Sequence, residues 1–288
     1  MLAIVAALLG SFCFAVSSIT INRGLLGMDY FTGLLVNLAT NAVLLWLFLA
    51  IFSQGIELWV PANLIFLGAG LMVLGLARFF IFKGMKRLGA SISFSLINIA
   101  PLFAISFAFL FLDERPTLTN LFGALFIVVG VVFLSWRGPT KTWNSRDLIF
   151  PIAAALQFAV RDNLVCYGLL IIHSPVLGAA ISATTSVLAI GIFYFAGAGR
   201  LRWTRENRMD LLFFLASGFM NFLSYLLMYT ALSLERVAIV SPLMNSSSLF
   251  VLPLTFFLLK DIERITSRKI FTTVFVVVGV FLISWEKI

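Results

Sequence analysis

The segments ERPTLTNLFGALFIVVGVVFLSW (Glu114–Trp136) and ERITSRKIFTTVFVVVGVFLISW (Glu263–Trp285) are two copies of one pattern. At a constant offset of 149 residues, 11 of their 23 positions are identical. A second pair, FAVSSITINRGLL (Phe14–Leu26) and FAVRDNLVCYGLL (Phe158–Leu170), shares both its ends at an offset of 144 residues. Because the first and last parts of the two halves correspond, the chain is an internal duplication. We expect one repeat over residues 1–138 and a second over residues 145–288.

The composition indicates that lipid surrounds most of this chain. Of its 288 residues, 61% are hydrophobic and 11% are charged, and the mean hydropathy is +1.09. A soluble domain carries roughly 25% charged residues, so this chain cannot cover a water-facing surface in the usual way. The net charge of +8 resides in short connections between apolar runs, which argues against nucleic-acid binding. Cys13, Cys166 and a single histidine are too few and too apolar in setting for a disulfide framework or a metal site.

Continuous apolar runs predict helices that cross a bilayer, since a spanning helix needs about 20 mostly apolar residues. The last run is short, and we expect its helix to begin near Ser267. The fold class is therefore all-α, a polytopic membrane protein of ten transmembrane helices. The expected spans are 2–22, 31–52, 62–82, 91–112, 118–136, 148–172, 176–198, 210–231, 237–259 and 270–285.

Five spans in each half make the two repeats inverted, because an odd number of crossings reverses the direction of entry. Inverted repeats are a recurring device of secondary transporters, in which the substrate site lies near the membrane midplane and one half rocks against the other. The plainer alternative is a duplication that only builds a stable bundle.

Basic residues divide unequally between the two faces. The odd-numbered connections hold 15 lysines and arginines, whereas the even-numbered connections and the C-terminal segment hold three. The positive-inside rule then places the odd connections in the cytoplasm and both termini outside. Short connections and a compact chain favour a bacterial plasma (inner) membrane.

Charges inside the spans are the first candidate site residues. Arg161 and Asp162 stand near the middle of the sixth span, where a charge costs about 2.5–3.5 kcal/mol on insertion scales and normally faces a cavity or a partner. Adjacent side chains diverge by about 100° on a helix, so we expect these two to meet imperfectly and to seek other partners. Arg78 is the other basic residue within a span. Two arginines and one carboxylate predict a site for an anionic or zwitterionic metabolite, or else an ion pair that only pins helices together.

Amides near prolines are a second set of candidates. Asn98 precedes Pro101 in the fourth span, and Asn245 follows Pro242 in the ninth. A proline within a helix frees a backbone carbonyl, and a kinked helix with an amide nearby can line a cavity. The alternative is hydrogen bonding between helices. Further candidate lining residues are Asn37, Asn41 and Tyr225, with Gln157, Asn221 and Tyr229 as weaker ones, while Gly123, Gly130 and Gly279 are expected to allow close helix packing.

The stretches FKGMKRLGASISFSLINIAPLFAISFAFLFLDERPT (Phe82–Thr117) and YTALSLERVAIVSPLMNSSSLFVLPLTFFLLKDIERIT (Tyr229–Thr266) carry a further resemblance. Each has a small-residue turn, an apolar helix with proline, an acidic end with Glu-Arg, and a glycine-bearing helix after it. This arrangement resembles the EamA-type module of the drug/metabolite transporter (DMT) superfamily over nearly the whole chain. The resemblance implies ten helices in two inverted modules and the carriage of a small metabolite. The first span has serines where the small multidrug members carry a carboxylate. The two Glu-Arg ends are expected to form local ion pairs and turns.

The resulting functional hypothesis is a secondary carrier, an exporter or exchanger, for a small anionic or zwitterionic metabolite such as an amino acid. Proton coupling could run through Asp162. The alternatives are an exporter of cationic or neutral drug-like compounds and a membrane scaffold that transports nothing. The sequence has no Gly-Lys-Ser/Thr nucleotide loop and no clustered catalytic residues, so we expect no cofactor, no metal and no enzymatic activity. The expected partners are a small-molecule substrate and the lipid bilayer, with no nucleic acid, and the chain is expected to be a monomer or homodimer.

Overall fold

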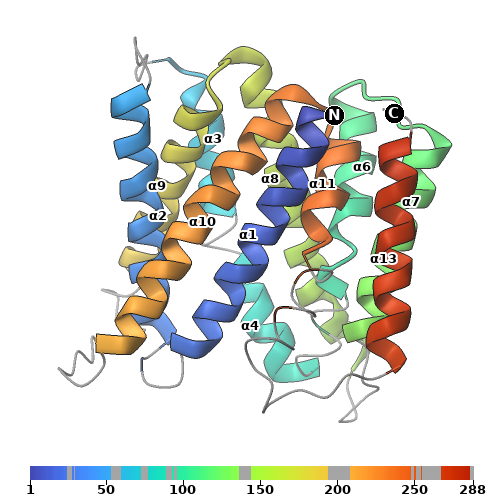
Figure 1. Cartoon of the computed structure of the whole chain (residues 1–288), viewed down its shortest axis with the longest axis horizontal. Coiled ribbons are helices and arrows are strands. Elements are labelled where there is room, and N and C mark those ends of the chain that lie inside the picture. Colours follow the sequence, from blue (N-terminus) through green and yellow to red (C-terminus); the bar gives the residue numbers. More distant parts are fainter. Residues whose placement is uncertain are drawn as a thin grey trace.

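The computed structural model describes residues 1–24, 28, 30–52, 60–72, 77–88, 93, 96–135, 144–193, 208–247, 250, 254 and 267–285. Every regular element within these ranges is helical, which confirms the all-α fold class. The helices stand roughly side by side in one bundle, as Figure 1 shows. They are α1 (Leu2–Gly24), α2 (Tyr30–Phe52), α3 (Asn63–Leu71), α4 (Ala77–Leu88), α6 (Ala100–Phe111), α7 (Leu118–Ser135), the 3-10 helix η2 (Ser145–Leu148), α8 (Ile149–Ile171), α9 (Pro175–Phe193), α10 (Arg208–Leu234), α11 (Val237–Asn245) and α13 (Ser267–Trp285).

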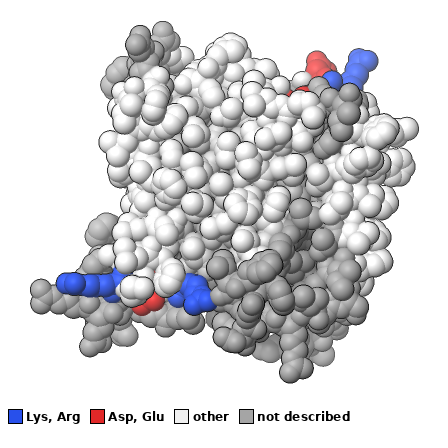
Figure 2. All heavy atoms as spheres, in the orientation of Figure 1, with Lys and Arg blue, Asp and Glu red and all other residues white. Residues whose placement is uncertain are grey.

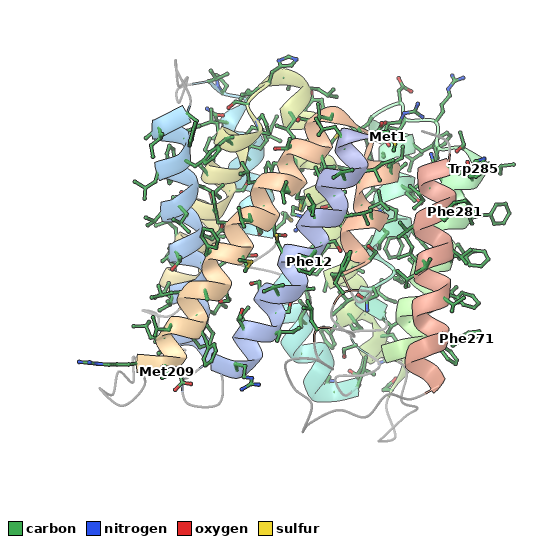
Figure 3. All side chains as sticks on the ribbon, viewed as in Figure 1. Met1, Phe12, Met209, Phe271, Phe281 and Trp285 are labelled. Carbon is green, nitrogen blue, oxygen red and sulfur yellow. The ribbon has the colours of Figure 1, made fainter. Side chains whose placement is uncertain are left out.

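Length and composition let five of the described helices cross a membrane, namely α1, α2, α8, α9 and α10. Shorter apolar segments lie in α6, α7 and α13. The expected start of the last span is confirmed, because α13 begins at Ser267. Phe271, Phe281 and Trp285 of α13 are about half exposed and point away from the bundle (Figure 3). Exposed rings of this size face hydrocarbon in a membrane protein, so α13 lies at the lipid-facing edge of the bundle.

Helices from opposite halves of the chain pack against each other in matching pairs. The first span, α1, packs on the eighth, α10, and the third, α3, packs correspondingly on the sixth, α8. In the same way, the first span of one half packs on the fourth span of the other: α1 contacts α11, and α8 contacts α6. The start of α1 and the end of α13 lie on the same face of the bundle (Figure 1), as an even total number of spans requires. This exchange of partners is the packing that two inverted five-helix repeats produce.

Glycines bring the paired helices into backbone contact. A Cβ atom added to Gly279 of α13 would lie 2.6 Å from the carbonyl oxygen of Gly123 in α7. Side chains therefore have no room at this crossing, and the expectation of close packing is confirmed for Gly123 and Gly279. Helices in lipid gain nothing from the hydrophobic effect when they associate, so close van der Waals packing has to hold them together. Small residues make this packing possible.

Two of the expected spans differ in the structure. Of the span expected over 62–82, the structure describes α3 and α4, with residues 73–76 outside the described part, and α4 runs on to Leu88. The span expected over 91–112 has a turn at Asn98 and Ile99, and α6 begins after that turn with Pro101 in its first turn. The expected kinked helix around Pro101 is thus wrong. Proline lacks an N–H and has a preset φ, so it suits the first turn of a helix better than an interior position.

The corresponding proline of the second half behaves differently. Pro242 lies inside α11, which ends at Asn245, and Ser246 and Ser247 form a turn directly after it. The fourth and ninth spans therefore both contain a turn in mid-course. Irregular backbone at membrane depth is tolerated where protein buries it or where it lines a polar site.

Candidate functional site

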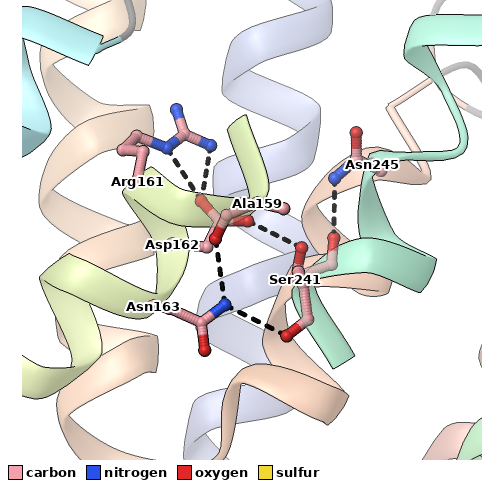
Figure 4. A network of polar contacts seen from close by, with 7 residues as sticks. Ala159, Arg161, Asp162, Asn163, Ser241 and Asn245 are labelled. Atoms are coloured by element: carbon pink, nitrogen blue, oxygen red, sulfur yellow. Dashed lines mark hydrogen bonds and ion pairs between the residues drawn. The ribbon is translucent and has the colours of Figure 1, made fainter. Parts of the chain in front are cut away.

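A polar network occupies the place where α8, α11 and α6 meet (Figure 4), near the middle of α8. Arg161 and Asp162 form an ion pair, with Nε and Nη2 of the guanidinium 2.8 Å and 2.6 Å from Oδ1 of the carboxylate. The other carboxylate oxygen, Oδ2, accepts a hydrogen bond of 2.7 Å from the hydroxyl of Ser241 on α11. Asp162 is 4% exposed, so its charge is buried and fully partnered.

The close ion pair corrects the expectation that these adjacent residues would meet imperfectly. Their Cβ atoms do diverge on the helix, but an arginine side chain is long enough to curl back along its own turn. Both guanidinium contacts fall on one carboxylate oxygen, and this leaves the second oxygen for Ser241. Asp162 therefore joins α8 to α11 while neutralising Arg161.

The guanidinium is not fully enclosed by its partner. Its side chain is 16% exposed, although it stands in the middle of a helix that α3, α4, α6, α10 and α11 surround. The centroid of the Phe158 ring lies 5.6 Å from the guanidinium carbon. Tyr225 and Tyr229 of α10 are close enough to interact electrostatically with Arg161. Within the described part of the chain, Nη1 has no hydrogen-bond partner. The N–H groups of Nη1 are thus not used by any described residue.

Amides complete the network on both sides. Asn163 of α8 donates to the carbonyl oxygens of Ala159, at 2.9 Å, and of Ala104 on α6, at 3.0 Å. Asn245 donates to the carbonyl oxygen of Ser241 at 2.9 Å, which satisfies a backbone group of the proline-containing helix α11. Three helices therefore hold the ion pair in a defined place.

A second polar network lies among α1, α2 and α10. Asn37 donates to the hydroxyl of Ser217 at 2.7 Å and accepts from the amide of Asn221 at 3.3 Å, while Ser17 donates to the carbonyl oxygen of Ser217 at 2.9 Å. Asn41, one turn along α2, is 0% exposed, and neither atom of its amide has a partner among the described residues. A buried amide without partners is unfavourable by about 1–3 kcal/mol, which marks Asn41 as a group that a ligand could satisfy.

The structure therefore divides the predicted site residues between two networks. Arg161, Asp162 and Asn245 lie in the first, and Asn37 belongs to the second, with Asn41 on the same face of α2. Tyr225 stands between them on α10, one turn after Asn221, and stacks on Tyr229 with ring centroids 6.1 Å apart. Asn98 is half-buried in the turn before α6 and belongs to neither network. Arg78 lies in α4, and its side chain is outside the described part of the structure.

Sequence reasoning missed Ser241, Asn163 and Ser217 as site residues. Ser241 had one usable signal, since it is a polar residue directly before a proline inside a span. Ser217 had none, because a serine in an apolar helix usually satisfies itself on the preceding turn, as Ser217 also does with Phe214.

The acidic end after α6 also differs from its expected role. The expected turn is present, with Asp113 at a positive φ of 53°. Glu114, however, does not make a local ion pair, because its two carboxylate oxygens accept the backbone N–H groups of Val237 and Ala238 in the other half of the chain. Glu263 and Arg264, the matching pair of the second half, lie outside the described residues.

The fold and these buried polar networks define an integral, multi-pass membrane protein built from two inverted repeats. The sequence profile of the EamA-like transporter family matches residues 1–136 and 148–285. The chain therefore belongs to this family, and it is a membrane transporter of the drug/metabolite transporter superfamily. The family consists of transporters rather than enzymes.

Solved structures support the same fold. Among 29 matching chains, one described only as "Crystal structure of protein" aligns with a TM-score of 0.79. The alignment covers 99% of this chain and 96% of that chain at 14% sequence identity, so it shows a shared fold. No curated protein matches the sequence.

Proposed function

We propose that this transporter is a secondary carrier for a small anionic or zwitterionic metabolite, such as an amino acid, with alternating access between its two repeats. The observation that carries the proposal is the Arg161–Asp162 ion pair at the centre of α8, whose guanidinium keeps one edge uncommitted. Charges at this depth are expensive and usually mark a transport pathway. An ion pair that only holds helices together would not need a partly exposed arginine.

The chemistry of the pair suits a carboxylate-bearing solute. Arginine offers a planar fork that binds a carboxylate through two parallel hydrogen bonds. A substrate carboxylate would bind the free edge at Nη1, and its amino group would then lie near Asp162. Asn41 and the neighbouring Asn37 network offer uncharged polar groups for the rest of the molecule.

Export of cationic or neutral drug-like compounds is the second candidate. The rings of Phe158, Tyr225 and Tyr229 beside the pair favour it, because aromatic faces attract cations. Against it, both oxygens of Asp162 already have partners, and the exposed group of the pair is the positive one.

The deciding experiment measures flux from liposomes that contain the purified protein. The liposomes are loaded with a mixture of amino acids, organic acids, nucleotides and amines, and mass spectrometry identifies the solutes that leave, with and without a pH gradient. Selective loss of anionic or zwitterionic solutes supports the proposal. Selective loss of amines overturns the arginine-based site in favour of the second candidate.

Replacing Asp162 with asparagine is expected to remove the effect of a pH gradient on transport. Asparagine keeps an acceptor for Ser241 but has no proton to exchange, and it leaves Arg161 without its counter-charge. The measurement compares initial flux with and without the gradient. Ser241→Ala is the control, because it deletes the hydrogen bond to Oδ2 of Asp162 but preserves the titratable carboxylate. A gradient effect that persists in Asp162→Asn shows that protons are coupled elsewhere.

The bacterial plasma membrane, with both termini outside, is the setting that the charge distribution supports. Figure 2 shows the described charges gathered at the two ends of the molecule with an uncharged belt between them. Arg115 and Arg236 lie on the face that carries the termini, while Arg23, Lys83, Arg87, Arg146 and Arg208 lie on the opposite face. Basic residues gather on the cytoplasmic side of membrane proteins.

Cysteine labelling tests this orientation. In a chain whose Cys13 and Cys166 are changed to serine, Arg115→Cys is expected to react with a membrane-impermeant maleimide added outside cells. Arg208→Cys, on the opposite face, is expected to react only after the membrane is opened. The reverse pattern would place the termini in the cytoplasm.

A further inference from the structure

Glu114 joins the two repeats at the face that carries the chain termini. It lies in the connection between α6 and α7 and is only 9% exposed. One carboxylate oxygen accepts the N–H of Val237 at 2.7 Å, and the other accepts the N–H of Ala238 at 3.1 Å. Glu114 belongs to the first repeat and α11 to the second, so these hydrogen bonds cross the boundary between the halves.

The two hydrogen bonds form the N-terminal cap of α11. The first N–H groups of a helix have no partner within it, and a negative charge there also interacts favourably with the helix dipole. The N-cap residue Arg236 makes no capping hydrogen bond with its own side chain. Glu114 therefore supplies from the other repeat the cap that α11 lacks.

The backbone around Glu114 is arranged to present its carboxylate. The positive φ of Asp113 ends the turn after α6, and the N–H of Glu114 returns to the carbonyl oxygen of Ala108 at 3.2 Å. From the other side, the guanidinium of Arg236 donates to the carbonyl oxygen of Arg115 at 3.2 Å. Among the described residues, this contact at the termini face thus has three hydrogen bonds between the repeats, and all three involve backbone groups.

Helix α11 connects this contact to the ion pair. Ser241 follows Val237 by four residues, which is one helical turn, and its hydroxyl holds Oδ2 of Asp162. A displacement of the first turn of α11 would therefore move the donor that positions Asp162. The path from Glu114 to Arg161 consists of the hydrogen bond to Val237, one helical turn to Ser241, the hydrogen bond to Asp162 and the ion pair with Arg161.

We propose that Glu114 is a latch between the repeats, which closes the bundle at the termini face and positions Ser241 against Asp162. Opening of this face then requires the carboxylate to leave α11, and the same movement loosens the ion pair. The link to substrate release rests on the proposed carrier function, whereas the latch itself does not.

The latch is also expected to respond to pH. Burial raises the pKa of Glu114 above its ordinary value of 4.5, while the two N–H groups and Arg236 offset part of this effect. Glu235 beside α11 raises that pKa further, and the other titratable or charged neighbours among the described residues are Asp113 and Arg115 in the same connection and Cys166 on α8. The closed latch therefore holds a proton more tightly than an open, hydrated one. Acid favours closure, and opening becomes easier as the pH rises through the raised pKa.

The native Cys166 reports on the latch without any substrate. It lies one turn beyond Asp162 toward the termini face, is buried, and has its sulfur 4.0 Å from the carbonyl oxygen of Leu232. In a Cys13→Ser background at fixed pH, an impermeant maleimide reaches this thiol only when the termini face opens. The labelling rate in proteoliposomes therefore measures the fraction of open protein.

Glu114→Ala is expected to raise the labelling rate of Cys166 about tenfold, because it leaves two buried N–H groups without partners. Glu114→Gln keeps one acceptor and should restore a rate near that of the parent at the same pH. The ratio of the two rates, in which thiol ionisation cancels, should change with pH only through Glu114. Arg115→Ala is the matched control, since it changes the adjacent exposed side chain and should leave the rate unchanged. An unchanged rate in folded Glu114→Ala, or an equal rise in Arg115→Ala, overturns the latch.

Val237→Pro tests the same contact from the other repeat and covers the case in which Glu114→Ala fails to fold. Proline is tolerated at the first position of a helix, and Arg236 has the extended backbone that precedes proline, with φ −62° and ψ 149°. This change deletes the donor to Oε1 of Glu114 and leaves the bond from Ala238 to Oε2 in place, so a smaller rise of about threefold is expected. No rise overturns the latch. If the variants label faster but the parent protein moves no solute, the latch is confirmed and the carrier function is rejected. If the parent protein moves solute but the variants label at the parental rate, the carrier function is confirmed and the latch is rejected.

Discussion

Replacing Arg161 with alanine is expected to lower the free energy of unfolding by about 3–5 kcal/mol and to reduce substrate flux about 100-fold or more. The loss of stability follows from Asp162, which would remain buried with a charge and with only Ser241 as its partner. The loss of flux follows from the guanidinium edge at Nη1, which has no substitute among the described residues. Thermal unfolding in detergent measures the first effect, and solute release from liposomes measures the second.

A double replacement separates the two effects. Arg161→Gln combined with Asp162→Asn removes both charges together and leaves amides that can bind each other and Ser241. Most of the lost stability should return, because replacing a buried ion pair as a unit is often nearly neutral. Flux should stay low, because neither amide binds a carboxylate as arginine does. A double variant that transports at the parental rate would reduce the pair to a structural pin.

Arg161→Lys refines the same prediction. Lysine keeps the positive charge but presents a point charge in place of a planar fork, so it cannot hold Asp162 and a substrate carboxylate along two edges at once. The protein should fold, and flux should remain well below that of the parent. Full activity in Arg161→Lys would show that the site requires charge alone.

Gly70→Ala is expected to destabilise the protein by about 1–3 kcal/mol, whereas Gly68→Ala on the same helix should have little effect. A Cβ atom at Gly70 would overlap the carbonyl oxygen of Ser182 and lie 2.9 Å from its Cα, and both are backbone atoms of α9. Backbone cannot rotate aside, so α3 and α9 would have to separate. Ser186 also donates to the carbonyl oxygen of Gly70 at 3.2 Å, a bond that separation would break.

The neighbouring glycine makes a strict control. An added Cβ at Gly68 meets nothing within 4 Å, and alanine favours a helix over glycine by about 1 kcal/mol. The midpoint of thermal unfolding should therefore fall for Gly70→Ala and hold or rise slightly for Gly68→Ala. Equal midpoints for the two variants would show that α3 and α9 adjust more freely than their contact implies.

Much of the fold was predictable because a segment that crosses a membrane must be both apolar and helical. A backbone in lipid must satisfy its own hydrogen bonds, so long apolar runs have to be helices. The repeated segments at Glu114 and Glu263 disclosed the duplication, and an odd number of spans per half then required inversion. Helix breaks were less predictable: Pro101 and Pro242 look alike in sequence, yet one begins a helix and the other lies within one.

The site was predictable in part, for a related reason. Arg161 and Asp162 stood out because charge within an apolar run is rare and expensive. Their partners did not stand out, since Ser241 is 79 residues away from Asp162 and serines are unremarkable in spans. The two asparagine clusters also read as one set in sequence, whereas helix packing places Asn37 with Ser217 and Asn245 with Ser241.

The sequence by itself determined the class of this protein, its ten apolar spans, its inverted duplication and the depth of its central charges. These properties follow from composition and spacing along one dimension. Only the tertiary structure decided that Asp162 binds both its neighbour Arg161 and a serine on α11, and that Glu114 caps a helix of the opposite repeat. The contacts of Asp162 with Ser241 and of Glu114 with α11 join residues far apart in the chain, and their geometry depends on how α8, α11 and the turn after α6 pack together.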